Sequence, residues 1–100
     1  MEREYKKCMD IKELNQVINN LKIGNCYKDL KIKGFKLNES DDILQELARQ
    51  KGLQFEIEFF EGSWIYTIIK PSKKFLNREG QWSMRMSKKA KEFIYEFKNA

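Results

Sequence analysis

Alternating hydrophobic and polar residues mark a β-hairpin in the middle of the chain. Residues 53–60 read LQFEIEFF, so one side of this strand is apolar and the other carries Glu56 and Glu58. Residues 64–70 are apolar at nearly every position, which is typical of a strand that is covered on both sides. Glu61-Gly62-Ser63 supplies turn residues between the two. The pattern predicts an acidic first strand and a central second strand.

A helical pattern precedes the hairpin at residues 11–21. Asp10 and Glu13 have the spacing of a capping box, in which each side chain accepts from the other residue's backbone amide. Gly24 is suited to end the helix. The apolar stripe expected to be buried comprises Ile11, Leu14, Val17, Ile18 and Leu21.

A second helix is predicted just before the hairpin, with Asn38 or Ser40 as its N-cap. Asp41 and Asp42 fall in its first turn, where carboxylates complement the helix dipole. Gly52 is suited to end it. Its expected buried face comprises Ile43, Leu44, Leu47 and Ala48.

The last helix is predicted over residues 87–98, capped by Ser87. Its buried stripe comprises Ala90, Phe93, Ile94 and Phe97. Lys88, Lys89 and Lys91 crowd its first turns, where positive charge opposes the helix dipole. A cluster placed at such a position favours an external anionic partner, although a solvated helix face explains it equally simply.

Two further strands complete the expected sheet. Residues 26–37 read as one strand with a bulge at Gly34, and its lysines are typical of an edge guarded against aggregation. Residues 81–86 alternate as a third antiparallel strand after the hairpin. Between the hairpin and the strand at 81–86, Pro71 ends the hairpin pairing. Residues 72–80 read as a loop in which Phe75-Leu76 docks on the core.

These elements predict a small α+β fold in one domain, residues 1–100. The expected order is α-β-α-β-β-β-α, with an antiparallel sheet of three to four strands packed by three helices. The polar residues 1–9 are expected to be loosely ordered.

Composition argues against an enzyme and for a binding protein. Of the 100 residues 41% are hydrophobic, enough for one core, but histidine is absent and the two cysteines are Cys8 and Cys26. Without histidine, the commonest general base and metal ligand are missing. We therefore expect no catalytic residues, no cofactor and no metal site. No export signal or membrane-length apolar run is present, so we expect a cytoplasmic protein with free thiols and no membrane partner.

The charge is divided into basic, acidic and basic segments. Lys and Arg outnumber Asp and Glu by nine to five over residues 1–38 and by nine to three over residues 63–100, whereas acids prevail seven to two over residues 39–62. Basic clusters can bind phosphate. The first hypothesis is therefore binding to nucleic acid, DNA or RNA and structured RNA included, or to a ribonucleoprotein or other nucleic-acid-processing complex. Its candidate residues are Lys31, Lys33, Lys36, Lys73, Lys74, Arg85, Lys88, Lys89 and Lys91.

From residue 41 onward, the predicted order and the SKKAK segment at 87–91 resemble a double-stranded-RNA-binding domain, in which such lysines contact phosphates. The lysine spacing differs by one residue, and the turn at 61–63 lacks that family's minor-groove contact. Residues 53–98 also resemble the arm-binding domains of phage-type integrases, but Glu56 and Glu58 give the sheet the wrong charge for DNA. Neither resemblance assigns the chain to a family.

The second hypothesis is a protein-binding inhibitor of a host nucleic-acid enzyme, encoded by a phage or mobile element. It would act by steric occlusion or by presenting carboxylates that mimic phosphates. Its candidate residues are Glu56, Glu58, Phe60, Glu61, Trp64 and Tyr66. A third hypothesis is homodimerisation through strand 64–70 or the edge strand 26–37.

Overall fold

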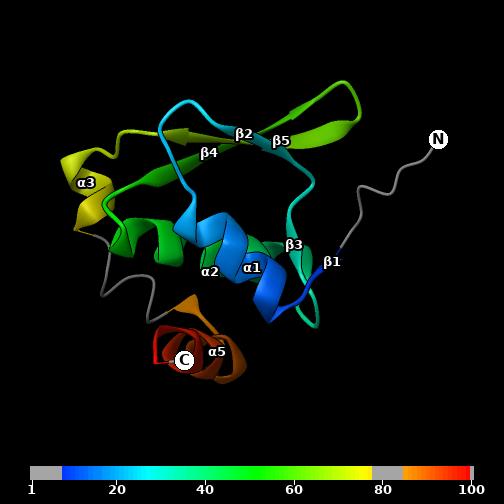
Figure 1. Ribbon diagram of the computed structural model, residues 1–100, viewed down its shortest axis with the longest axis vertical. Helices are drawn as coiled ribbons and strands as arrows, with labels where there is room; N and C mark the ends of the chain where they lie inside the picture. The colour runs from blue at the N-terminus through cyan, green and yellow to red at the C-terminus, as the bar shows by residue number, and fades with distance from the viewer. Residues whose placement is uncertain (1–7, 78–84, 100) are drawn as a thin grey trace.

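The fold is three layers deep, with a β-sheet, two helices beneath it and a further helix below them (Figure 1). This computed structural model describes residues 8–77 and 85–99. The strands are β1 (Cys8–Met9), β2 (Cys26–Lys28), β3 (Lys31–Ile32), β4 (Gln54–Phe60) and β5 (Ser63–Ile69). The helices are α1 (Ile11–Asn19), α2 (Leu37–Gln50), α3 (Lys73–Leu76) and α5 (Lys88–Lys98). The predicted α+β class is confirmed, while the element order differs in part.

The predicted hairpin forms the middle and one edge of a three-stranded antiparallel sheet. Its strand order is β2-β5-β4, so β5 is central as its apolar pattern predicts. Glu61 and Gly62 both have positive φ, 49° and 81°, as a two-residue type I′ turn requires. This turn aligns Phe60 with Ser63 and sets the register down to Gln54 opposite Ile69.

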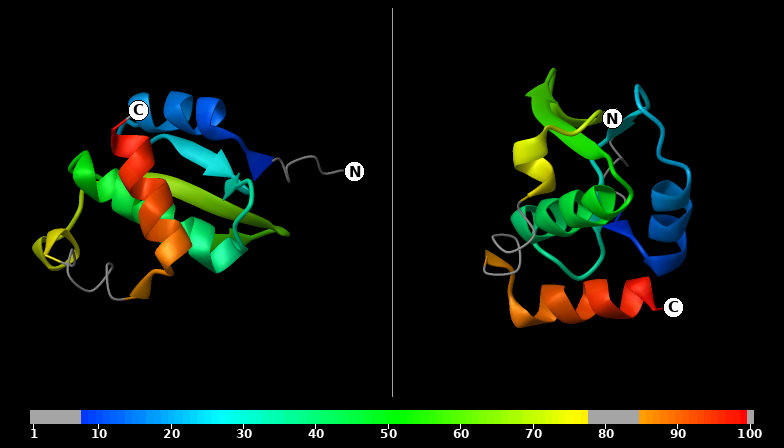
Figure 2. Two further views of the ribbon diagram at one scale, coloured as in Figure 1. Left: turned by 90° about the horizontal axis from the view of Figure 1, so that it is seen from below. Right: turned by 90° about the vertical axis from the view of Figure 1, so that its left-hand side faces the viewer.

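The helices cover one face of this sheet. α2 ends in a Schellman motif, in which Gly52 at φ 76° donates to the Arg49 carbonyl and Leu53 donates to the Ala48 carbonyl. α5 packs on the far side of α2 from the sheet (Figure 2). The largest fully buried side chains come from the strands and from the two helices beneath the sheet, and they include Tyr66, Phe55, Leu14, Ile32, Ile43, Leu44 and Ile68.

Local capping confirms two of the predicted helix starts. Asp10 Oδ1 accepts from the Glu13 amide at 2.9 Å, and Glu13 Oε1 accepts from the Asp10 amide at 3.1 Å. Ser87 Oγ accepts from the Ala90 amide at 3.1 Å. The first helix ends at Asn19, before Gly24, and Ile11 is 49% exposed. The predicted stripe is therefore correct at Leu14 and Ile18 but wrong at Ile11.

The predicted strand 26–37 is wrong as a single element. Asp29 adopts φ 50° and divides it into β2 and β3. β3 pairs in parallel with β1, so Cys8 and Met9 are part of the fold, and Met9 is buried. Phe35 is buried in the following loop, while Leu37 is exposed and already belongs to α2.

The second helix begins earlier than predicted. Lys36 is its N-cap, so neither Asn38 nor Ser40 caps it. Ser40 instead lies fully buried inside α2, where its Oγ accepts from the Ile32 amide at 2.9 Å. The hydroxyl therefore joins α2 to β3. The buried face that the periodicity predicts is confirmed at all four positions, Ile43, Leu44, Leu47 and Ala48.

The segment after the hairpin also differs from the prediction. Ser72 caps the short helix α3, and Phe75 within it is buried against the core as expected. The predicted strand 81–86 lies mostly outside the described residues. At its end, Arg85 is helical and Met86 is in a bend, so neither belongs to a strand.

Candidate functional site

The tip of the β4–β5 hairpin extends past the helical layer and carries exposed aromatic rings (Figure 1). Phe59 and Phe60 are each 60% exposed, and Trp64 is 37% exposed. The rings of Phe59 and Trp64 meet edge to face, with centroids 5.1 Å apart. Phe59 lies on the side that alternation predicts to be buried, and this part of the prediction is wrong because the helices do not reach the tip.

The base of the tip is fixed to the turn after β2. The Asp29 amide donates to the Trp64 carbonyl at 2.8 Å, and the Trp64 amide donates to Asp29 Oδ1 at 3.0 Å. These two bonds continue the pairing of β2 with β5 beyond Lys28. The backbone at the base of the aromatic tip is therefore hydrogen-bonded to a neighbouring segment. This pre-ordering lowers the conformational entropy that the tip would lose on binding a partner.

The face of the sheet opposite the helices is uncovered by any described element (Figure 1). The sheet register places Glu56 and Glu58 of β4 along one side of this face, beside Thr67 and Ile65 of the central strand. Both glutamates are exposed, and no described residue forms a salt bridge with them. Phe60 and Glu61 continue this acidic and aromatic strip to the turn.

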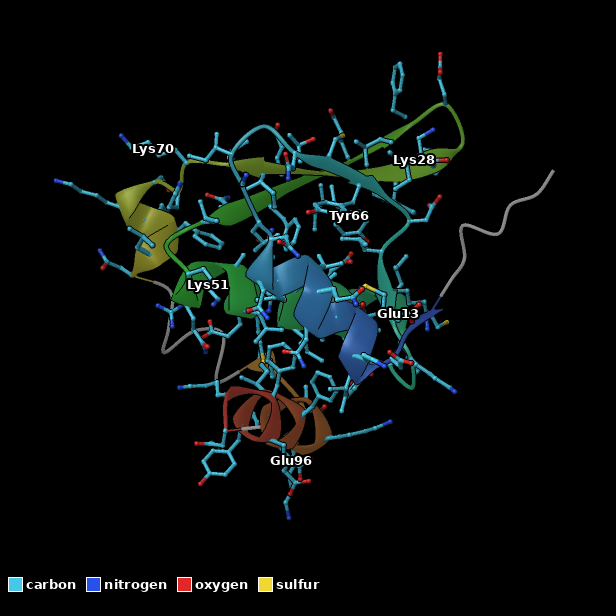
Figure 3. The ribbon with its side chains drawn as sticks, viewed as in Figure 1. Glu13, Lys28, Lys51, Tyr66, Lys70 and Glu96 are labelled. Carbon is cyan, nitrogen blue, oxygen red and sulfur yellow. The ribbon has the colours of Figure 1, made fainter. Side chains whose placement is uncertain are left out.

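Tyr66, one of the predicted partner-binding residues, is fully buried (Figure 3). Its hydroxyl donates to Asp41 Oδ1 at 2.6 Å. Burial, and then the hydrogen bond to Asp41, raise the pKa of Tyr66 well above its usual value. Burial also raises the pKa of Asp41, against the opposing effect of the Tyr66 hydrogen bond. Since Tyr66 joins α2 to β5 inside the core, it does not belong to a binding surface.

Two of the predicted phosphate-binding lysines are engaged in holding a loop. Lys89 Nζ donates to the Gly34 carbonyl at 2.6 Å and lies 4.7 Å from the centre of the Phe35 ring. Lys31 Nζ donates to the Phe35 carbonyl at 2.6 Å. These bonds place the start of α5 beside the loop that follows β3. They also give both lysines a structural role.

The remaining basic candidates do not form one surface. Arg85 donates to Asp42 at 2.6 Å, so part of its charge is neutralised. Lys33, Lys36, Lys88 and Lys91 are exposed around the start of α5 and the neighbouring loop. α3, which carries Lys73 and Lys74, adjoins the C-terminal end of α2, where the Leu76 carbonyl accepts from Arg49, whereas the loop with Lys33 and Lys36 precedes the start of α2 (Figure 2).

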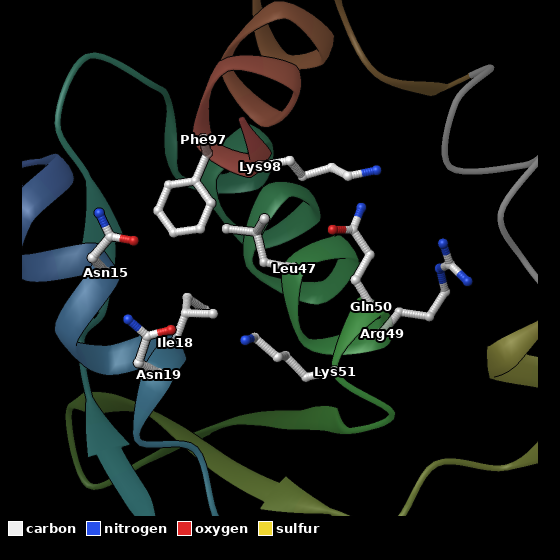
Figure 4. A pocket seen from close by; sticks show the side chains of 9 residues that line it. All are labelled: Asn15, Ile18, Asn19, Leu47, Arg49, Gln50, Lys51, Phe97 and Lys98. Atoms are coloured by element: carbon white, nitrogen blue, oxygen red, sulfur yellow. The ribbon is translucent and has the colours of Figure 1, made fainter. Parts of the chain in front are cut away.

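A cavity of about 700 Å³ lies among the C-terminal ends of α1, α2 and α5 (Figure 4). Ile18, Leu47 and Phe97 contribute apolar lining, and Lys51 and Lys98 contribute positive charge. Both lysines stand at helix C-termini, where they offset the negative end of the dipole. Their placement is therefore accounted for without an anionic ligand.

Two polar residues of this cavity are also engaged within the protein. Arg49 forms a bidentate ion pair with Glu46, at 2.8 and 2.7 Å, and Gln50 donates to the same carboxylate at 3.0 Å. The pairing satisfies the charge of the buried Glu46.

A second cavity of about 370 Å³ separates the start of α1 from α5. Lys33 and Lys89 line it together with Asp10, Glu92 and Glu96. Because three carboxylates line the hollow together with only two ammonium groups, it has no net preference for phosphate.

The described residues contain no cluster of three or more His, Cys, Asp or Glu side chains that could hold a metal ion. Cys8 and Cys26 are free thiols, as predicted, and Cys26 Sγ lies 3.6 Å from Thr67 Oγ1. Over the described ranges, no helix has the length and apolar character needed to cross a membrane. Comparison with family models, curated proteins and solved structures gives no match.

Sequence reasoning identified the acidic and aromatic residue types of the hairpin but missed two features. It did not separate the exposed Phe59 from the buried Phe55, since both follow the same alternation. It also gave no role to Gln45, whose side-chain amide contacts Phe55 of β4. The sequence feature that could have indicated this contact is the position of Gln45, a polar residue on the half-buried side of a predicted helix.

Proposed function

We propose that this chain is a non-catalytic protein-binding module that docks through the tip of its β4–β5 hairpin. The observation that carries the proposal is the exposure of Phe59 and Phe60 at the end of a fully paired hairpin. Clustered exposed aromatic rings are typical of interface hot spots, because burying them removes a large apolar area from water. Scattered exposed residues such as Ile11 need no such explanation.

The charge beside the rings selects a basic partner. Glu56, Glu58 and Glu61 are exposed on the same strand and turn. Complementary charge on the partner would speed association and exclude acidic surfaces. Enzymes and ribonucleoproteins that handle nucleic acids carry basic surfaces of this kind. Inhibition of a nucleic-acid enzyme by occlusion of such a surface is therefore the form of the function that we favour.

The test is affinity capture from cells that encode this protein, followed by a binding measurement with the purified partner. Lysates are treated with nuclease so that nucleic acid cannot bridge the two proteins. We expect Phe59→Ser combined with Phe60→Ser to weaken partner binding at least tenfold. The matched control is Tyr95→Ser on α5, which removes another exposed ring (70% exposed) and should leave binding unchanged. Equal binding by all three proteins would refute the hairpin as the interface.

Nucleic-acid binding is a second candidate function, supported by one contact. The bond from Lys89 to Gly34 lies between the start of α5 and the loop that carries Lys33 and Lys36, so these lysines and Lys88 are on neighbouring segments. Such a group can contact phosphates, and binding should then weaken steeply as salt rises.

A mobility-shift assay on single- and double-stranded DNA and RNA tests this second candidate. Replacing Lys33 and Lys88 with alanine should reduce binding and its salt dependence, whereas the same replacement of Lys73 and Lys74 on α3 should have little effect. Absence of binding by the wild-type protein at low salt would exclude the second candidate.

A further inference from the structure

The outer edge of β4 presents backbone hydrogen-bonding groups that the sheet leaves unused. In an antiparallel hairpin with a two-residue turn, the two residues that flank the turn exchange backbone hydrogen bonds. Along each strand, the N–H and C=O groups of successive residues then point alternately toward and away from the partner strand. Starting from the pair Phe60–Ser63, the amides of Glu58 and Glu56 point toward β5. Those of Phe59, Ile57 and Phe55 point away from it.

Contacts on both sides of the hairpin agree with this alternation. On β5, the Asp29 amide donates to the Trp64 carbonyl, and the Ile68 amide donates to the Asn25 carbonyl, so these β5 residues face β2. On β4, Gln45 Nε2 donates to the Phe55 carbonyl at 2.7 Å. The Phe55 amide in turn donates to Gln45 Oε1 at 3.0 Å. The side-chain amide of Gln45 thus occupies the outer edge at Phe55 as a neighbouring strand would.

The outer edge of β4 is open beyond Phe55. Among the described residues, no backbone or side-chain group bonds to the outward amides and carbonyls of Ile57 and Phe59. An uncovered edge of this kind is a template for strand addition. We propose that a lysine- or arginine-bearing extended segment of the partner protein pairs with β4 at Ile57 and Phe59. This inference rests on the proposed function and specifies its binding mode.

Charge selects this occupant over a second copy of the chain. A strand added at the outer edge brings its open-face side chains next to Glu56 and Glu58. If two copies paired antiparallel about Glu58, the two Glu58 side chains would oppose each other. If they paired about Ile57, Glu56 would oppose Glu58. Like charges directly opposite each other destabilise a sheet, whereas lysine or arginine at those positions would stabilise it.

The side chains on the helix side of β4 determine which residue types the added segment carries at every second position. Ile57 is half-buried and Phe59 is exposed on the helix side of β4. Apolar residues of the partner would pack against them, since neighbouring residues across a ladder lie on the same face. The segment expected to bind therefore alternates basic and apolar residues.

The probe for the test is a synthetic nine-residue peptide that alternates lysine and valine and is capped at both ends. Titration into the full-length protein should shift the backbone NMR signals of Ile57 and Phe59 and protect their amides from hydrogen exchange. A peptide alternating glutamate and valine should not bind. Two further lysine peptides are N-methylated, one at its valine amides and one at its lysine amides. We expect one of them to lose binding, and which one reports the strand direction.

Equal binding by the unmodified and both methylated lysine peptides would overturn the proposal, because only charge attraction would then remain. Binding of the glutamate peptide in place of the lysine peptide would overturn it as well. So would protection of the Ile57 and Phe59 amides from hydrogen exchange that arises only from dimers of the protein, without peptide. Failure of the lysine peptide to bind at all would also overturn strand addition. The hairpin could still bind a partner through its rings, which the variants Phe59→Ser and Phe60→Ser test separately.

A pair of variants at one position isolates the backbone. Phe59→Pro removes the outward amide but keeps the ladder to β5, since proline is tolerated on an edge with its nitrogen facing out. Phe59→Thr removes the same ring and keeps the amide. Loss of one hydrogen bond predicts about three- to tenfold weaker peptide binding by Phe59→Pro than by Phe59→Thr. Unchanged NMR shifts in β5 confirm that both variants fold, and equal affinities would contradict the proposal.

Discussion

Single buried polar groups join separate parts of this fold. Ser40 is fully buried on α2, and its hydroxyl accepts from the Ile32 amide of β3. β3 is only two residues long and pairs with the two-residue β1. Strands this short gain little from their own ladder. The hydroxyl of Ser40 therefore contributes strongly to holding β3 in place.

Replacing Ser40 with alanine should destabilise the protein by about 1–3 kcal/mol, because the Ile32 amide would remain buried without an acceptor. Urea unfolding followed by circular dichroism measures the change. Asn19→Ala serves as the control, since Asn19 is exposed on α1 and should shift the free energy of unfolding by less than about 0.5 kcal/mol. Equal changes in the two variants would mean that the Ser40 bond is unimportant.

The Asp41–Tyr66 pair gives the protein a specific pH dependence. Burial raises the pKa of Asp41 above 3.8, so the folded state holds this proton more tightly than the unfolded state does. The resulting stabilisation is complete below pH 3.8 and is lost as the pH rises through the raised pKa. Carboxylates whose pKa is lowered by folding show the opposite trend.

Asp41→Asn should remove this loss while keeping an acceptor for the Tyr66 hydroxyl. The free energy of unfolding of the variant, minus that of the wild type, should therefore increase between about pH 3 and pH 7. Chemical denaturation at several pH values provides the measurement. A difference that stays constant or decreases over this range would show that Asp41 does not titrate as described.

At the scale of whole elements, α5 is stable despite the charges in its first turn. Ser87 caps it, and Ala90 and Ile94 are buried against the rest of the protein. Lys88 is its first residue, where a positive charge opposes the helix dipole. Packing thus outweighs an unfavourable electrostatic interaction of about 0.3–1 kcal/mol.

Lys88→Glu should raise the free energy of unfolding by about 0.5–1 kcal/mol, because a carboxylate favours a helix N-terminus. Lys98→Glu is the matched control at the opposite end, where the same change should destabilise α5. Thermal and urea unfolding of both variants provide the measurement. Shifts of the same sign would show that net charge, and not the dipole, determines the result. If the second candidate function holds, Lys88→Glu would also weaken nucleic-acid binding.

The sequence predicted the elements that repeat a regular pattern and missed those that depend on distant contacts. Helical periodicity located the buried face of α2, alternation located β4, and a nearly continuous apolar run located β5. The division of residues 26–37 was not predictable from local pattern, because Asp29 takes its left-handed conformation where it bonds to Trp64, 35 residues away. The burial of Ser40 depends likewise on β3 packing against α2.

At the scale of the whole molecule, the sheet has one face under helices and one face open. The acidic and aromatic composition of the hairpin could be read from the sequence, whereas the exposure of Phe59 depends on how far β4 and β5 extend past the helices. The same holds for the basic candidates. The sequence shows the lysine residues, but only the fold shows that Lys73 and Lys74 are separated from the lysines near α5.

The arrangement of acids on β4 predicts that the protein does not self-associate through this edge. Sedimentation velocity should show a monomer over a wide concentration range. Glu56→Gln combined with Glu58→Gln removes the like charges and should allow concentration-dependent dimers to form. Gln54→Glu on the same strand is a control that adds an acid and should remain monomeric. A wild-type dimer with the same affinity as the double variant would contradict this charge effect.

The amide of Gln45 sets the length of chain that β4 can accept. It closes the edge at Phe55, and the type I′ turn closes it after Phe60. Only the groups at Ile57 and Phe59 remain between these two stops. A strand that enters this space therefore forms few backbone bonds, so its dissociation is expected to be fast and its selection to depend on side chains. The side-chain amide of Gln45 on α2 therefore limits the length of an added strand. Replacing Gln45 would lengthen the open edge of β4 by one residue pair.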